Sequence, residues 1–379
     1  MTVNRSFTAL AAIVAALLCS AAPAAAQRDV PQNFYGVDYD ADIADDAPSA
    51  LQDEQFSEQA KTGVETTRVV FSWKRVQSRN GGTPHWSVTD PIVEHAASHG
   101  IDLLPVVIDA PRFARENPNA YHSPPLKDPR YMARFMVALI GRYGVNGSFW
   151  SEHPDVPKRP LRTWQIWNEP HLRFQWDSDR PWAKDYGRQL RFDYKAIKRA
   201  DPGATVVLAG LSNTSWEFLD EAYRKGRIHG YFDVAAMHPY TRRPDGVVAL
   251  VRRFRTVMRR HHDSRKQVWI TELGLPASKG QVKTDNVLQT SDSGMADFLT
   301  TSIEKLVAYQ KSPNVRVARV YWYSWASTYC CKDIFRYTGL REYDPREQTL
   351  ADKPALSTYL DSARRHQGCV KTSTATCEP

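Results

Sequence analysis

The chain has 379 residues, of which 42% are hydrophobic, 24% charged and 11% aromatic. This is the composition of an ordinary globular protein, and it excludes a disordered, collagen-like or multi-span membrane protein. The 50 Lys and Arg residues outnumber the 42 Asp and Glu residues, so the formal net charge is +8. That mild excess permits an acidic partner without requiring one.

The first 26 residues have the three-part layout of a secretory signal peptide. Arg5 is their single charge, an apolar run covers residues 9–18, and small residues lead to Ala26. The apolar run is too short to span a bilayer. The sequence therefore predicts that residues 1–26 are removed, that the protein is exported, and that it has no membrane anchor.

Cysteine usage agrees with export, because an even number of cysteines in an exported protein suggests disulfides. Cys330, Cys331, Cys369 and Cys377 follow the leader segment. Three pairings are open: a Cys330–Cys331 bond with a Cys369–Cys377 loop, or either of two pairings that tie the tail to the region around residue 330. A zinc site is the rival interpretation, but the chain lacks the usual Cys-x-x-Cys spacing.

Short apolar runs rich in β-branched and aromatic residues alternate with amphipathic stretches, which is typical of buried parallel strands joined by helices. The expected strands are 33–37, 67–71, 102–108, 164–167, 205–208, 234–237, 267–270 and 317–323. Eight such units without an internal linker favour an α/β fold, a single-domain (β/α)₈ barrel over residues 27–365. The alternative, an open doubly wound sheet, would need a Gly-rich turn after the first strand. Residues 366–379 are expected to form a cysteine-containing tail.

Two of the expected strands end in a glutamate. The fourth runs into Asn168, Glu169 and Pro170, and the seventh runs into Glu272 and Gly274. Active sites of barrel enzymes lie at the C-terminal ends of the strands. Two carboxyl groups there suit glycoside hydrolysis, because one can protonate the leaving oxygen while the other attacks the sugar or activates water. The alternative is a pair of surface carboxylates that cap the following helices.

The segments 167–170 (Trp-Asn-Glu-Pro) and 271–274 (Thr-Glu-Leu-Gly) resemble the signatures of clan A glycoside hydrolases, most of all family 39 and its bacterial relatives, with family 5 next. The resemblance covers roughly residues 33–327. It implies a (β/α)₈ barrel that retains anomeric configuration. It also implies that Glu169 is the acid/base, Glu272 the nucleophile, and Asn168 a partner of the sugar 2-hydroxyl.

The supporting residues follow from the same comparison. A charge within an apolar strand needs a partner, and the clan commonly places an Arg where Arg68 stands, beside the nucleophile. Its expected role is to keep Glu272 ionised; pairing elsewhere on the barrel floor is the alternative. After the sixth strand, we expect Tyr240 to bond Glu272, and His238 to face the sugar or the acid/base. Mere packing is the alternative for both.

Three further residues complete the predicted site. Trp325 is expected to form the platform under the cleaved sugar, with Trp322 in reserve. Asp109, at the end of the third strand, either binds a hydroxyl or caps the turn before Pro111.

Other patterns favour ordinary structural roles. His95 and His99 share a helix face but lack the His-Glu-x-x-His order of zinc proteases, so no metal site is predicted. The arginines of residues 252–260 lie on an amphipathic helix without interleaved aromatics, which argues against a nucleic-acid partner. No organic cofactor is expected.

The sequence thus favours a secreted retaining glycoside hydrolase that cleaves β-glycosidic bonds in oligo- or polysaccharides, with β-xylosides and β-glucosides as the expectation at family level. The alternative from another class is an inactive carbohydrate-binding barrel protein, because fold alone does not establish function. Inactive relatives usually lack one glutamate, whereas both are present here.

Export provides a first test. The mature protein is expected to begin at Gln27, because the small residues up to Ala26 form the cleavage site. Intact-mass measurement of the exported protein checks this. A mass that includes residues 1–26, or a lipid on Cys19, would contradict it.

Overall fold

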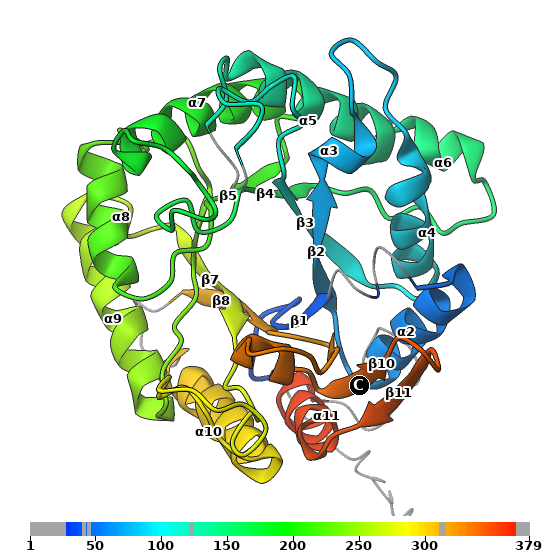
Figure 1. Ribbon diagram of the computed structural model, residues 1–379, viewed down its shortest axis with the longest axis vertical. Helices are drawn as coiled ribbons and strands as arrows, with labels where there is room; N and C mark the ends of the chain where they lie inside the picture. The colour runs from blue at the N-terminus through cyan, green and yellow to red at the C-terminus, as the bar shows by residue number, and fades with distance from the viewer. Residues whose placement is uncertain (1–27, 40–42, 44–46, 121–124, 311–315, 369–379) are drawn as a thin grey trace, which may run out of the picture.

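The computed structural model describes residues 28–39, 43, 47–120, 125–310 and 316–368. Eight parallel strands close into a barrel, and β8 pairs with β1 to complete it (Figure 1). The strands are β1 (Tyr35–Tyr39), β2 (Thr66–Ser72), β3 (Asp102–Ile108), β4 (Thr163–Ile166), β5 (Thr205–Val207), β6 (Val234–Met237), β7 (Gln267–Leu273) and β8 (Val317–Trp322). The predicted single-domain (β/α)₈ barrel is confirmed, and each expected strand is present with its ends moved by at most three residues.

Helices surround the barrel (Figure 1). They are α2 (Ser49–Lys61), α3 (Trp73–Val76), α4 (Asp90–Ser98), α5 (Arg130–Tyr143), α6 (Ser148–Glu152), α7 (Trp182–Ala200), α8 (Ser215–Arg224), α9 (Pro244–Arg260), α10 (Asp292–Gln310) and α11 (Pro354–Gln367), with 3₁₀ turns η1 (Trp86–Val88) and η2 (Ile334–Tyr337). None of the helices in the described part of the chain is long and apolar enough to cross a membrane.

Helix α9 shows how the apolar pattern positions a helix. Val247, Val251 and Phe254 are buried, as expected for residues that recur at helical spacing on one face. Most of its arginines are exposed, but Arg255 is buried and donates to the backbone carbonyls of Ser264 and Lys266, both at 2.7 Å. The basic run therefore includes one arginine that ties the helix end to the turn before β7.

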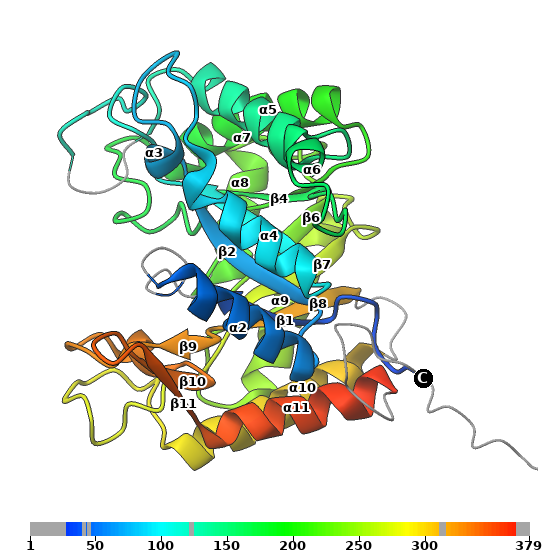
Figure 2. The same cartoon turned by 90° about the vertical axis from the view of Figure 1, so that its right-hand side faces the viewer.

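A small sheet after β8 was not predicted. It has three strands in the order β11-β10-β9. They are β9 (Ala326–Ser327), β10 (Arg341–Asp344) and β11 (Thr349–Asp352). In Figure 2 this sheet lies on the same side of the barrel as α3, which directly follows β2. The sheet and η2 therefore sit at the C-terminal mouth of the barrel, where they shape the rim of the candidate site.

The predicted domain boundary at residue 365 falls within the last helix. Helix α11 continues to Gln367, and His366 and Gln367 are buried. The His366 carbonyl accepts from the backbone N–H of Asp29 at 2.8 Å, so the last helix is joined to the start of the described chain. The tail from residue 369 onward, like the predicted leader segment, lies outside the described residues.

Of two glycines within helices, one is tightly packed against a neighbouring segment and the other faces open space, so the pair tests packing with an internal control. A Cβ at Gly187 in α7 would lie 2.1 Å from the Gly226 carbonyl oxygen, whereas one at Gly141 in α5 meets nothing within 4 Å. Gly187→Ala should lower the free energy of unfolding by about 1–3 kcal/mol, because backbone must shift. Gly141→Ala should raise it by up to about 1 kcal/mol through helix propensity. Chemical denaturation measures both, and effects of the same sign would contradict the close approach of α7 to Gly226.

Candidate active site

The end of β4 positions Glu169 through an unusual backbone. Trp167 and Glu169 have φ values of 69° and 42°, in the left-handed region that non-glycine residues seldom adopt. The Trp167 N–H donates to the Val107 carbonyl and the Glu169 N–H donates to the Gly210 carbonyl, each at 3.1 Å. These bonds to β3 and to the segment after β5 hold the turn, and the Glu169 carboxyl reaches the ring of His238 beyond β6.

Glu272 lies near the end of β7, and both of its carboxylate oxygens have partners. Oε1 lies 3.0 Å from Nη1 of Arg68, and Oε2 accepts from the Tyr240 hydroxyl at 2.7 Å. The side chain of Arg68 is 3% exposed, so this ion pair is almost completely removed from water. The predicted contacts of Arg68 and Tyr240 with Glu272 are both present.

Arg68 uses its other donors to connect further strands. Nη1 also donates to Asp38 on β1 at 2.5 Å, Nη2 donates to Asn168 at 2.8 Å, and Nε donates to Gln165 on β4 at 2.8 Å. Burial by itself would lower the pKa of Arg68, but the charges of Asp38 and Glu272 outweigh burial and raise it. The guanidinium therefore stays charged and forms ion pairs with two buried carboxylates, those of Asp38 and Glu272.

His238 lies between the two glutamates. Its Nδ1 is 2.9 Å from Oε1 of Glu169 and 3.3 Å from Oε2 of Glu272, and its side chain is fully buried. The ring packs directly against Gly210, where a Cβ would lie 1.9 Å from Nε2. Of the two positions predicted for His238, the sugar or the acid/base side, the structure places it on the acid/base side.

Burial sets the protonation of the groups around Glu169. It raises the pKa of Glu169 above its usual range, against hydrogen bonding to Ser212 and the charges of His171 and Arg68. Burial also lowers the pKa of His238 to about 4, although the Glu272 carboxylate opposes the change. Near neutral pH, His238 is therefore a neutral imidazole, while Glu169 holds a proton more readily than an ordinary glutamate.

The two carboxyl groups are close together. One oxygen of Glu169, one of Glu272 and a ring nitrogen of His238 all lie within 4.8 Å of one another. Among the described residues, these three form the group whose ligand atoms are close enough to hold a metal ion. The Arg68 guanidinium beside Glu272 repels a cation, so the electrostatics of this site do not favour metal binding.

The structure does not support the predicted tryptophan platform. Trp325 is 0% exposed, and its indole N–H donates to Gln55 of α2 at 3.0 Å. Trp322 is 2% exposed and donates to the Thr338 carbonyl at 3.0 Å. Since neither indole offers a face at the mouth, the prediction for both is wrong: β8 and the following sheet bury them in the barrel wall.

Other aromatic rings stand beside the catalytic candidates instead. Phe335 of η2 packs edge-on against Tyr240 with ring centroids 5.0 Å apart, and lies 6.4 Å from the ring of Tyr323. Tyr323 and Phe335 are both partly exposed. The sequence alone did not single them out, because Phe335 reaches the site only through the unpredicted sheet that follows β8.

One carboxylate oxygen of Asp109 is bound by neighbouring side chains of the protein. Oδ2 accepts from the Ser72 hydroxyl at 2.9 Å and lies 3.3 Å from Nζ of Lys74. Its side chain is 27% exposed. These contacts tie the ends of β2 and β3 together. The two predicted roles of Asp109, binding a hydroxyl or capping the turn before Pro111, stay predictions.

Four further residues belong to the site and were missed from the sequence. Asp38 and Gln165 bind Arg68, Thr271 bonds His238, and Ser212 contacts Glu169. Asp38 and Gln165 are polar side chains within apolar strands, which is the same pattern that led to the prediction of Arg68. Ser212, after β5, had no such signal.

The described cysteines do not form a disulfide. The Sγ atoms of Cys330 and Cys331, both exposed in the loop before η2, lie 2.8 Å apart, which exceeds the roughly 2.05 Å of a disulfide bond. Cys369 and Cys377 lie outside the described residues. The predicted Cys330–Cys331 bond is therefore not present, and the two pairings that join these cysteines to the tail stay predictions.

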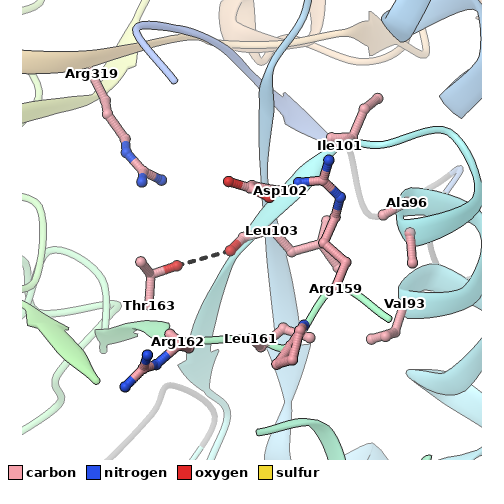
Figure 3. A pocket seen from close by; sticks show the side chains of 12 residues that line it. Val93, Ala96, Ile101, Asp102, Leu103, Arg159, Leu161, Arg162, Thr163 and Arg319 are labelled. Carbon is pink, nitrogen blue, oxygen red and sulfur yellow. Dashed lines mark hydrogen bonds and ion pairs between the residues drawn. The ribbon is translucent and has the colours of Figure 1, made fainter. Parts of the chain in front are cut away.

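A cavity of about 250 Å³ lies at the opposite end of the barrel (Figure 3). Asp102 and Thr163, at the starts of β3 and β4, line it, and Thr163 donates to the Leu103 carbonyl at 2.9 Å. Arg319 reaches this cavity from β8 with its guanidinium 4.0 Å from the centre of the Trp269 ring. In barrels of this kind the N-terminal face serves stability rather than catalysis, so this cavity is not the candidate active site.

The amino-acid sequence matches no protein-family model and no curated protein. Solved structures do share the fold. A family 39 glycoside hydrolase from Bacteroides cellulosilyticus WH2 is 17% identical with a TM-score of 0.63, over 89% of this chain and 64% of that one. A monomeric β-xylosidase from Caulobacter crescentus CB15 is 17% identical with a TM-score of 0.61, over 88% of this chain and 69% of that one.

A third similar structure is a family 1 β-glucosidase from Thermotoga maritima, which is 12% identical with a TM-score of 0.62, over 90% of this chain and 99% of that one. The chain thus spans less than two thirds of the length of the Bacteroides protein, but nearly all of the Thermotoga protein. At these identities the similarity establishes a shared barrel fold. The families compared include the one that the two glutamate motifs resemble.

The environment of Glu169 predicts how stability depends on pH. A raised folded-state pKa means that the stability contributed by this carboxyl is present below its unfolded pKa of about 4.3 and is lost as pH rises through the folded value. Glu169→Gln should therefore be more stable than the native chain at neutral pH, and the gain should disappear near pH 3–4, roughly the lower end of that window. Unfolding curves across pH measure this.

Glu152 provides a control of opposite sign. Hydrogen bonding to Arg142 lowers the pKa of Glu152, so its contribution is present above the unfolded pKa and is lost as pH falls. Glu152→Gln should be less stable at neutral pH, with the difference vanishing in acid. If both variants shift stability in the same direction, burial does not govern Glu169.

Proposed function

We propose that this protein is a retaining β-glycosidase in which Glu169 is the acid/base and Glu272 the nucleophile. The observation that carries the proposal is a pair of buried carboxyl groups at the barrel mouth whose nearest atoms lie within 4.8 Å. Retaining enzymes hold the two groups about 5–5.5 Å apart, whereas inverting enzymes separate them by about 6.5–9.5 Å to admit water. The short separation favours direct attack by one carboxylate.

The surroundings divide the two roles. Burial favours the protonated form of Glu169, which suits the group that protonates the departing glycosidic oxygen. Glu272 is bound by Arg68 and by the Tyr240 hydroxyl, and both contacts stabilise a carboxylate. Burial, followed by the Glu272 charge, raises the pKa of Tyr240, so its hydroxyl keeps its proton and donates it to Oε2.

The first step breaks the glycosidic bond. Glu169 gives its proton to the leaving oxygen, and the Glu272 carboxylate attacks the anomeric carbon, which leaves a glycosyl ester on Glu272 and an ionised Glu169. Asn168 accepts from Arg68 through Oδ1, which orients its Nδ2 group as a donor for the sugar 2-hydroxyl. Phe335 packs against Tyr240, the partner of Glu272, and together with Tyr323 it offers partly exposed aromatic surface in place of the predicted tryptophans.

The second step releases the sugar. Glu169, now a carboxylate, takes a proton from water while the oxygen of that water attacks the anomeric carbon and displaces Glu272. Two displacements at one carbon restore the original configuration. No additional oxidant, reductant or organic cofactor enters this sequence of steps.

We further propose export and a carbohydrate polymer or oligomer as substrate. The signal-like segment 1–26 supports export. The similar structures include a β-xylosidase and a β-glucosidase, which supports β-xylosides and β-glucosides as the first substrates to assay. A panel of aryl glycosides and polysaccharides, analysed for product length, tests activity directly. Binding without cleavage would favour the inactive carbohydrate-binding alternative.

Removal of each glutamate should give a different signature. Glu272→Ala should abolish turnover, and azide should restore it with inverted configuration because azide enters from the vacated face. Glu169→Ala should slow substrates with poor leaving groups by about 10²–10⁴-fold, yet still form the intermediate with good leaving groups. Azide should then release a product of retained configuration. Steady-state rates and the configuration of the azide products check both.

The control is Glu94→Ala on α4, a glutamate of the outer helix ring, which should behave as the native enzyme in every assay. Exchanged azide outcomes for the two catalytic candidates would reverse their roles. An inverted product from the native enzyme would exclude the covalent intermediate altogether.

A further inference from the structure

Two buried residues in the motif strands take no part in the reaction steps above. Gln165 lies on β4 before the turn that carries Glu169, and Thr271 lies on β7 directly before Glu272; both side chains are completely buried. They lie in a chain of contacts that runs from Arg68 through Gln165 and Thr271 to His238 and ends at Glu169. We propose that Gln165 and Thr271 are positioning residues that hold His238 as the Nδ1-protonated tautomer, so that His238 donates to the acid/base Glu169. This inference rests on the proposed glycosidase function.

The first step is the orientation of the Gln165 amide. Its Oε1 lies 2.8 Å from Nε of Arg68, a group that can only donate. Its Nε2 lies 3.1 Å from the Leu208 carbonyl oxygen, a group that can only accept. The two contacts agree, so the amide is oriented without ambiguity and its NH₂ group faces Thr271 Oγ1 at 3.5 Å.

The second step is the direction of the Thr271 hydroxyl. Because Gln165 presents donors to one side of Oγ1, the single proton of Thr271 is directed to the other side, where Nε2 of His238 lies at 3.0 Å. Nε2 then accepts. A neutral imidazole carries one proton, so that proton is on Nδ1.

An independent argument comes from the other side of the ring. Nδ1 lies 2.9 Å from Oε1 of Glu169 and 3.3 Å from Oε2 of Glu272. The Glu272 oxygen already accepts from Tyr240, so a lone pair at Nδ1 would face an acceptor in a site shielded from water, whereas an N–H satisfies it. The same N–H is satisfied by Oε1 of Glu169 when the Glu169 proton is on the other oxygen. Both ends of the imidazole therefore select the same tautomer.

This tautomer matters for proton transfer. When Nδ1–H donates to Oε1 of Glu169, the carboxyl proton must be on Oε2, so it is not sequestered against the ring. With the opposite tautomer, Glu169 could donate its proton to the Nδ1 lone pair and would be a poorer acid toward the leaving oxygen. The Gln165–Thr271 pair thus keeps the acidic proton available to the substrate.

Kinetics with leaving groups of graded basicity test the chain. Thr271→Val removes Oγ1 and should lower kcat/KM by about tenfold or more for poor leaving groups, a part of the 10²–10⁴ that general acid catalysis supplies. It should have little effect on activated aryl glycosides, so log kcat/KM should fall more steeply with leaving-group pKa. Thr271→Ser keeps the hydroxyl and should restore the native slope.

A matched control separates this effect from the loss of any buried hydroxyl. Thr67 on β2 is also completely buried, and its hydroxyl donates to Gln59 of α2 at 2.6 Å, away from His238. Thr67→Val should leave the slope unchanged. A slope that is unchanged in Thr271→Val, or equally altered in Thr67→Val, would overturn the inference.

The tautomer is measurable without any kinetic assay. In the native protein labelled with ¹⁵N-histidine, the two ring nitrogen shifts of His238 should identify Nδ1 as the protonated nitrogen, with His238→Asn providing the assignment. Nε2 protonation would overturn the inference even if the protein is a glycosidase. Nδ1 protonation in a protein that cleaves no glycoside would instead contradict the proposed function and leave the hydrogen-bond chain intact.

Discussion

One buried guanidinium organises the mouth of this barrel. Arg68 donates to Asp38, Gln165, Asn168 and Glu272, which lie on or directly after β1, β4 and β7. A buried charge is costly unless it is paired and hydrogen-bonded, and here every donating nitrogen of Arg68 has a partner. Because these partners come from strands that are distant in sequence, the site can form only when the barrel has closed.

The same burial gives two neighbouring glutamates different chemistry. Glu272 forms an ion pair with Arg68 and accepts a hydrogen bond from Tyr240. Glu169 has the neutral His238 and Ser212 beside it, and burial raises its pKa. Two carboxyl groups whose environments differ in this way can act as acid and nucleophile within one site. The low exposure of the pair also strengthens every electrostatic contact that distinguishes them. Burying two carboxyl groups costs free energy, and the packing and hydrogen bonds of the surrounding barrel must offset that cost.

Much of the site could be anticipated from local patterns. Glutamates at the ends of two apolar strands, and an arginine within a third, are visible in sequence because a charge interrupts an apolar run. Asp38 and Gln165 carry the same signal and could have been found in the same way. The tryptophans show where this reasoning fails: Trp322 and Trp325 lie close together near the end of β8, yet both are turned into the barrel wall. Their orientation depends on the sheet that follows β8, whose short strands leave little periodic signal.

Local patterns were enough to predict the barrel, the order of its strands and the positions of the two glutamates. The alternation of apolar strands with amphipathic helices, and a charge at the end of an apolar run, can both be recognised from neighbouring residues. Three contacts become visible only in the folded barrel: His238 bridges those glutamates, Phe335 lies against Tyr240, and Thr271 bonds the far side of His238. These contacts join residues from different strands and loops across the barrel. They depend on strand register and tilt, and the apolar pattern of a single strand does not specify its alignment with the others.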